Sequence, residues 1–192
     1  NSRGGSFVLV RFEDKQRYMM GMLGFVALGC ACASLVFSII SIALPYWYYI
    51  ESSSQTSTYK SYIGLWRSCR DVTILGQTQA VCLEFGDKDV ADFLKATRAF
   101  EIIGLLLVAG AGIIGFLKLV IMKENAILPT IAGGLAIAAG LCMILGAIIY
   151  GAKTKDALLE TGYTLHAGFA LAIVSGVISF AAGGLFVAAK SS

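Results

Sequence analysis

Four long apolar segments alternate with polar ones along the chain. A helix rises 1.5 Å per residue, so about 20 mostly apolar residues are needed to cross a bilayer core about 30 Å thick. Segments of this kind occupy residues 19–44, 99–122, 127–150 and 165–189. Pro45 ends the first segment, because proline lacks a backbone N–H and restricts the residue before it. The sequence therefore predicts four transmembrane helices.

The polar segments between these spans define the organisation of the chain. Residues 45–98 form one long loop, and residues 151–164 form a second, short loop on the same side. We expect a single four-span unit over residues 19–189. It is preceded by a cytosolic segment at residues 1–18 and followed by a cytosolic stub at residues 190–192.

Composition agrees with a membrane protein and excludes several functions. Of the 192 residues, 57% are hydrophobic and 14% are charged, whereas soluble domains carry about 25% charged residues. The net charge of +3 lacks the clustered Lys and Arg of a nucleic-acid-binding surface, so the expected partners include the lipid bilayer but no nucleic acid. His166 is the sole histidine. We therefore expect no metal site, no cofactor and no catalytic residues.

Cysteine usage predicts the orientation in the membrane. Cys30, Cys32 and Cys142 lie within spans, where we interpret them as small apolar packing residues. Cys69 and Cys82 share the long loop, and a disulfide between them requires an oxidising compartment. Both loops are then extracellular or lumenal, with both termini cytosolic. The localisation that we expect is the plasma membrane, and the alternative for the two loop cysteines is a pair of free thiols.

The long loop has the pattern of a small sheet followed by a helix. Beyond the sheet region, apolar residues recur at helical spacing up to Thr97, with Asp87 or Asp89 placed to cap a short helix. The predicted fold class is an all-α membrane protein, in which a four-helix bundle carries a small extracellular antiparallel sheet. The β-prone stretches are residues 46–50, 59–66 and 80–85.

Such a loop needs extra stabilisation, because a few strands alone are marginal in water. A bridge from Cys69 to Cys82 closes a loop that the chain-entropy estimate stabilises by roughly 3 kcal/mol. Trp66 lies well inside the loop, so we expect it to be buried and to anchor the base of the sheet. Trp47 is either a second anchor or an interfacial belt residue.

These residues together resemble the superfamily of claudins, peripheral myelin protein and epithelial membrane proteins, which also contains the channel gamma subunits and a lens fibre membrane protein. The family keeps an arginine at the start of its second span, matched here by Arg98 within residues 96–100. The resemblance implies a left-handed four-helix bundle topped by a sheet of first-loop strands plus one second-loop strand. Its first-loop signature is matched by Trp47, by Gly64, Leu65 and Trp66, and by Cys69 and Cys82.

The resemblance implies a function in cell–cell contact, adhesion or a paracellular barrier such as the tight junction. Like molecules in the same or an apposed membrane would then be the partners. The alternative is an auxiliary, gamma-type subunit bound to the pore-forming subunit of an ion channel or receptor. A transporter or channel in its own right is disfavoured, because the spans carry few polar residues to line a path.

Two features inside the spans need a separate interpretation. Gly110, Gly112 and Gly115 fit a dinucleotide-binding pattern, but their place within a span favours close helix packing instead. Glu101 is the one carboxylate near a span interior. Its position near the end of the span predicts interfacial hydration, with Arg98 one turn away as a possible ion-pair partner.

Overall fold

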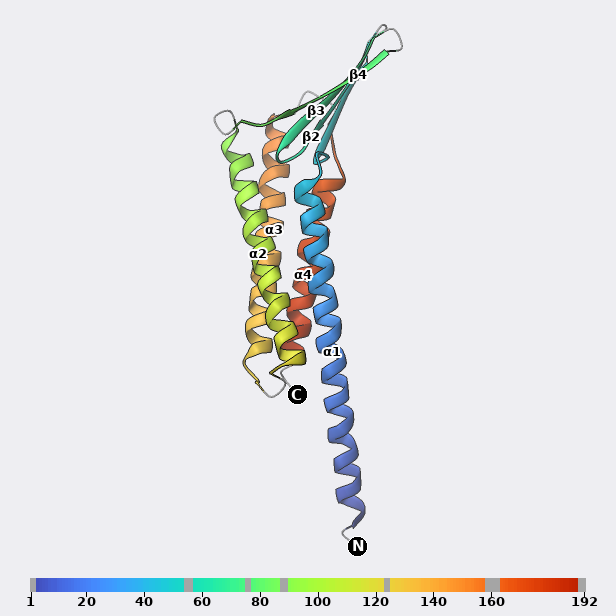
Figure 1. The fold of residues 1–192 in the computed structure, drawn as a ribbon, viewed down its shortest axis with the longest axis vertical. Helices are drawn as coiled ribbons and strands as arrows, with labels where there is room; N and C mark the ends of the chain where they lie inside the picture. The colour runs from blue at the N-terminus through green and yellow to red at the C-terminus, as the bar shows by residue number, and fades with distance from the viewer. Residues whose placement is uncertain are drawn as a thin grey trace.

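The computed structural model describes residues 3–53, 57–74, 77–86, 90–122, 125–157 and 163–189. Four helices lie side by side and a sheet projects from one end of them (Figure 1). In chain order the elements are α1 (Arg3–Ala43), β1 (Tyr48–Ser53), β2 (Ser57–Ile63), β3 (Arg67–Ile74), β4 (Gln77–Glu84), α2 (Asp92–Val120), α3 (Leu128–Ala157), β5 (Tyr163–Leu165) and α4 (Ala167–Ala188).

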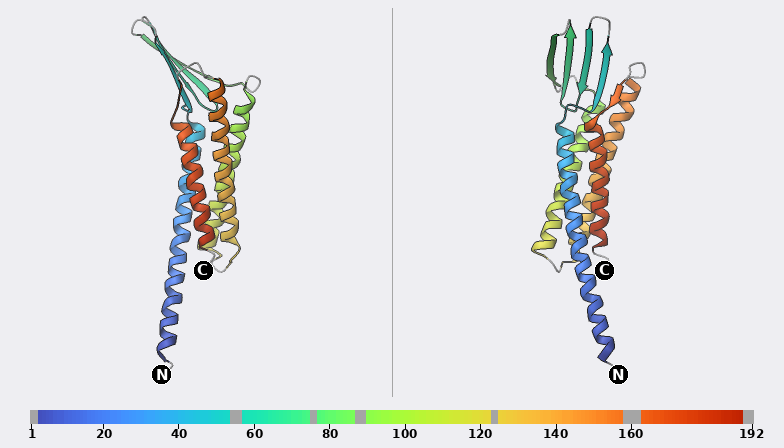
Figure 2. Two further views of the ribbon diagram at one scale, coloured as in Figure 1. Left: turned by 180° about the vertical axis from the view of Figure 1, so that it is seen from behind. Right: turned by 90° about the vertical axis from the view of Figure 1, so that its right-hand side faces the viewer.

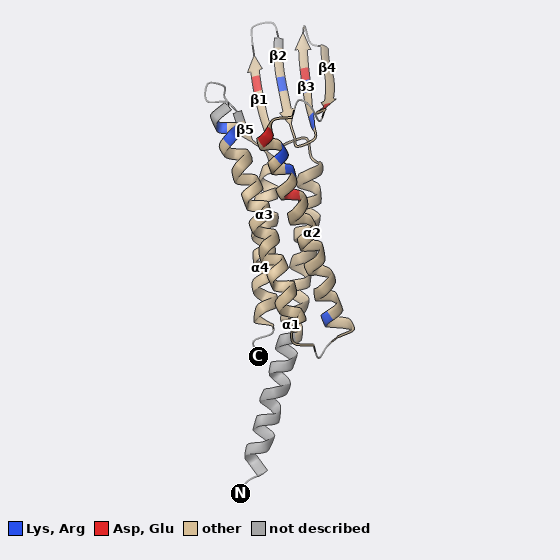
Figure 3. Cartoon of the chain, turned by 90° about the vertical axis from the view of Figure 1, so that its left-hand side faces the viewer, with Lys and Arg blue, Asp and Glu red and all other residues tan. Residues whose placement is uncertain are grey.

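Each helix contains a segment long and apolar enough to cross a membrane, namely Gly21–Ala43, Asp92–Val120, Leu128–Lys155 and Ala167–Ala188. Large apolar side chains such as those of Leu106 and Ile113 remain exposed on the bundle, as lipid contact requires. Charged residues of the described segments gather on the sheet and towards the helix ends (Figure 3). The predicted four-span membrane architecture is confirmed.

The bundle is held by a seam of small and apolar residues. The buried positions of α2 alternate in steps of three and four residues, the spacing that keeps one helix face turned towards its neighbours. This helix packs mainly against α3, while α4 packs against α3 and α1. The buried residues of α2 are Leu94, Thr97, Glu101, Gly104, Val108, Ala111 and Gly115.

Glycines allow a close approach between α3 and α4. A Cβ on Gly140 would lie 2.7 Å from the Gly176 carbonyl oxygen, and a Cβ on Gly183 would lie 2.9 Å from that of Gly133. Larger residues at these positions would push the two backbones apart. The expectation that Gly112 serves the same purpose is wrong, because a Cβ there would meet no atom within 4 Å.

Several polar side chains of the spans are turned into the bundle. Ser34 and Ser175 exchange hydrogen bonds, each hydroxyl donating to the other's carbonyl at 2.9 Å. Ser179 donates to the Ala136 carbonyl at 2.7 Å. These bonds join neighbouring helices, so the serines of the spans face the inside of the bundle and not the lipid.

The sheet has five antiparallel strands in the order β4-β3-β2-β1-β5. The β5 strand comes from the second loop, as the resemblance implied. It pairs with β1 and leads directly into α4, so it connects the sheet to the bundle (Figure 2). The predicted strand over residues 59–66 ends early, at Ile63, because the next three residues form the turn that leads to β3. The predicted short helix is the beginning of α2, and its proposed caps, Asp87 and Asp89, lie outside the described residues.

Candidate functional site

The disulfide joins the two strands at the outer side of the sheet. Cys69 of β3 and Cys82 of β4 are direct cross-strand partners, with their Cα atoms 4.0 Å apart and their sulfurs bonded. Antiparallel partners at close range suit such a bridge. The predicted disulfide is confirmed. It links β4, whose residues are all exposed, to a strand that is paired on both sides.

Trp47 joins the sheet to the helices. Its side chain is fully buried and its ring packs 4.8 Å from Tyr150 of α3 and 6.3 Å from Phe169 of α4. Its indole Nε1 donates to the Ser41 carbonyl at 2.8 Å. In a continuing helix that carbonyl would accept from residue 45, but Pro45 has no N–H, so the indole supplies the missing donor. The alternative of an interfacial belt residue is wrong for Trp47.

Gly64 and Leu65 form the turn that sits on the end of α1. A Cβ on Gly64 would lie 2.6 Å from Pro45 Cα and 2.7 Å from the Leu44 carbonyl oxygen, so the turn leaves no space for a side chain. The following residue, Leu65, is fully buried in the same cluster as Trp47. The Gly-Leu pair therefore brings the β2–β3 connection into direct contact with the bundle.

Trp66 does not insert between sheet and helices, and the expectation of burial is wrong. Its side chain is 41% exposed, and the Arg98 guanidinium lies over its ring at 4.6 Å from the centroid. Arg98 also donates from Nε to the Leu65 carbonyl at 2.8 Å. The arginine thus connects α2 to the turn, while Trp66 covers its outer face. The buried position expected for Trp66 belongs to Trp47.

Glu101 is fully buried in the seam, so the expectation of interfacial hydration is wrong. Its carboxylate packs against Gly146 of α3, where an added Cβ would lie 3.1 Å from Oε1. Neither carboxyl oxygen has a hydrogen-bond partner within the described part of the chain, and Arg98 is turned towards Leu65 instead. The signal for burial was present in the sequence, since Glu101 falls within the three-and-four spacing of α2.

The register of the sheet separates two chemically different faces, because cross-strand partners and alternate residues share a face. One face carries the Cys69–Cys82 bridge and the charged pairs, and we call it the disulfide face. We call the other the apolar face, and Arg70 is its one charged residue among those described. The disulfide face holds Tyr49, Glu51, Lys60, Tyr62, Arg67, Cys69, Asp71, Cys82 and Glu84, and the apolar face holds Tyr48, Ile50, Tyr59, Arg70, Val72, Ile74, Val81 and Leu83.

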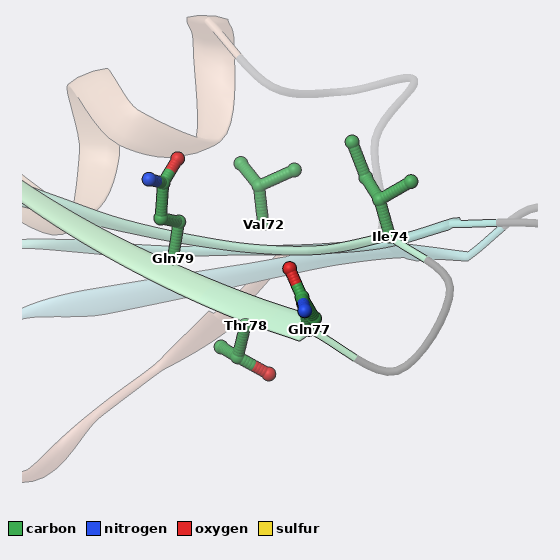
Figure 4. Close-up of a pocket in the computed structure, with 5 residues that line it drawn as sticks. All are labelled: Val72, Ile74, Gln77, Thr78 and Gln79. Carbon is green, nitrogen blue, oxygen red and sulfur yellow. The ribbon is translucent and has the colours of Figure 1, made fainter.

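An open cavity of about 540 Å³ lies at the outer end of the sheet. Figure 4 shows Val72, Ile74 and Gln79 pointing to one side of the hairpin, the apolar face, while Thr78 points to the other. Its lining combines the aliphatic side chains of Val72 and Ile74 with two side-chain amides and the hydroxyl of Thr78. Within the described segments no cluster of three or more His, Cys, Asp or Glu side chains is placed to hold a metal ion.

On the disulfide face, Glu51 interacts with both a tyrosine hydroxyl and a lysine ammonium. This residue accepts a hydrogen bond from the Tyr49 hydroxyl through Oε2 and lies 3.7 Å from the Lys60 ammonium through Oε1. The hydrogen bond to Glu51 raises the pKa of Tyr49 to about 12. On the apolar face, burial raises the pKa of Tyr48.

Comparisons with known proteins agree with this geometry. The family model described as the PMP-22/EMP/MP20/Claudin family matches residues 18–186, which include the first three spans, the whole sheet and all but the last two residues of the fourth span. A search of curated proteins found no match to the chain. The chain therefore belongs to the PMP-22/EMP/MP20/Claudin family.

Proposed function

We propose that this protein acts in cell–cell contact, as an adhesive or barrier-forming molecule, through the sheet that its bundle carries. The Cys69–Cys82 disulfide supports an extracellular sheet, because such bonds persist in oxidising compartments. With four spans, this orientation gives both termini a cytosolic position. The proposed location is the plasma membrane, where contact between cells takes place. Family membership supports the same general role.

The observation that carries the proposal is the free edge of the sheet. All eight residues of β4 are exposed, and the strand pairs with β3 on one side only within the described chain. Val81 and Leu83, exposed by 51% and 59%, present apolar groups beside this edge. An exposed edge strand with apolar side chains is a template for another chain, which suits contact between like molecules.

The sheet is also presented in a fixed position. Trp47 and Leu65 fill the junction with the helices, Arg98 bonds to the same turn, and the disulfide holds the outer strand. Binding by an ordered surface loses less conformational entropy than binding by a mobile loop. These residues are thus proposed to determine the geometry of contact without touching the partner.

Co-culture of cells that carry differently tagged copies tests the proposal. We expect the protein to accumulate where two expressing cells touch and to stay evenly distributed where an expressing cell meets a non-expressing one. Affinity purification from native membranes should then recover both tags. Recovery of a pore-forming channel or receptor subunit in stoichiometric amounts, with no accumulation at contacts, would instead establish the auxiliary-subunit role.

A further inference from the structure

Four aromatic side chains meet at the junction of the sheet with α1 and α4. Tyr46 comes from the connection after α1, Tyr49 from β1, Tyr62 from β2, and His166 directly precedes α4. We call this group the aromatic box. The ends of α1 and α4 lie side by side below it (Figure 2), and these are the ends of two membrane spans. The box therefore lies at the depth of lipid headgroups.

The four rings form a closed circuit. Ring centroids are 5.1 Å apart from Tyr46 to Tyr62, 5.1 Å from Tyr62 to Tyr49, 6.3 Å from Tyr49 to His166 and 5.8 Å from His166 to Tyr46. A square of such sides has a half-diagonal of about 4 Å, so a cation seated about 4 Å above its centre is within roughly 6 Å of every ring, the range of cation–π attraction.

The box is held in place by the backbone and remains accessible. The Tyr46 carbonyl accepts from the Gly168 N–H at 2.7 Å, and the His166 N–H donates to the Trp47 carbonyl at 2.9 Å. Tyr46 is 37% exposed and His166 is exposed as well. The rings are thus fixed by main-chain bonds on their inner side while their outer side is open to a ligand.

A carboxylate stands beside the box. Glu51 accepts the Tyr49 hydroxyl proton in a hydrogen bond, which places negative charge next to the rings. It shares that charge with Lys60, but both side chains are more than 40% exposed, so the ion pair is weak and open to exchange. Tyrosines are common at membrane interfaces, where their amphipathic rings lie at headgroup level. A closed circuit with an adjoining carboxylate is a more specific arrangement.

We propose that the aromatic box binds the choline headgroup of a membrane lipid. A quaternary ammonium has no N–H to satisfy, so it suits a site lined by aromatic rings, whereas a lysine or arginine of a partner protein needs hydrogen-bond acceptors. The position at the ends of two spans favours a lipid over a soluble ligand. The bound headgroup would fix the sheet's base relative to the bilayer surface.

Lipid competition on the purified full chain tests this site. The protein in detergent receives equal amounts of phosphatidylcholine and phosphatidylethanolamine with identical acyl chains, and native mass spectrometry counts the lipids retained. We expect the wild type to prefer phosphatidylcholine roughly fivefold. Tyr62→Leu should abolish the preference, while Tyr62→Phe, which keeps the ring, should stay within about twofold of the wild type.

The matched control is Tyr59→Leu, the same change on the same strand but on the apolar face. An unchanged preference in Tyr62→Leu, or an equal loss in Tyr59→Leu, would overturn the proposal. Should Tyr62→Leu fail to fold, competition on the wild type decides: tetramethylammonium must displace phosphatidylcholine, and a lysine-rich peptide must not. Soluble phosphocholine that binds as well as the lipid would refute the assignment to a membrane lipid.

Discussion

Removing either tryptophan separates the two roles that the structure assigns to them. Trp47 is fully buried, so Trp47→Ala leaves a cavity and should lower the free energy of unfolding by about 3–5 kcal/mol. The Ser41 carbonyl also loses its donor, which adds about 1 kcal/mol. Trp66 is 41% exposed and leaves no closed cavity, so Trp66→Ala should lose about 1–3 kcal/mol.

Amide hydrogen exchange in detergent measures separately how each variant affects the sheet and the spans. In Trp47→Ala the protected amides of β1 and β5 should exchange at rates approaching those of an open loop, while the amides in the middle of the four spans stay protected. Trp47→Phe, which keeps most of the ring but not the N–H, should fall between wild type and Trp47→Ala. In Trp66→Ala the sheet should remain protected. Equal loss of protection in both alanine variants would refute the assignment of the junction to Trp47.

Three further predictions use other parts of the molecule. Gly140→Leu should lower stability by about 1–3 kcal/mol, because the helix crossing is full, whereas Gly112→Leu should stay within about 0.5 kcal/mol. Thermal unfolding in detergent compares the two, and equal losses would contradict the crossing. Glu101→Met should raise stability by about 1–3 kcal/mol, since it removes a buried carboxyl without a hydrogen-bond partner among the described residues; a lower unfolding temperature would refute this. Glu51→Gln should bring the pKa of Tyr49 from about 12 back towards 10, measured by tyrosinate absorbance. Because folding raises this pKa, the contribution of the neutral phenol to stability is complete below about pH 10 and is lost as the pH rises towards 12. An unchanged titration would exclude Glu51 as the cause.

The spans and the disulfide were predictable because they depend on local composition. Twenty apolar residues can only be accommodated in lipid as a helix, and the two loop cysteines lie in one short polar segment. The resemblance to the family also implied a sheet of first-loop strands plus one second-loop strand, and the structure has four strands of the first kind and one of the second. These features require no knowledge of which side chain touches which.

The details of packing were not predictable from single residues. Trp47 and Trp66 both stand in the family signature, but Trp47 is buried at the junction and Trp66 is exposed beside the tight turn at Gly64. Gly112 and Gly140 are equally small, but Gly140 lies at the helix crossing and Gly112 faces away from any neighbouring atom. Glu101 was placed by its distance from the end of the span, although its spacing along α2 indicated burial. Side-chain direction accounts for all three differences. It depends on helix phase for Gly112 and Glu101, and on the local path of the loop for the two tryptophans.

The central claim, that the exposed sheet makes the contact, is tested most directly by charge on β4. Val81→Glu with Leu83→Glu alters the apolar face beside the free edge, and Arg70 lies opposite Val81 to balance the first new carboxylate. Ala80→Lys, which adds a charge opposite Asp71 on the disulfide face, is the control. At equal surface abundance, the double variant should lose its accumulation between expressing cells and the control should keep it. Undiminished accumulation of the double variant would show that the contact does not depend on this edge of the sheet.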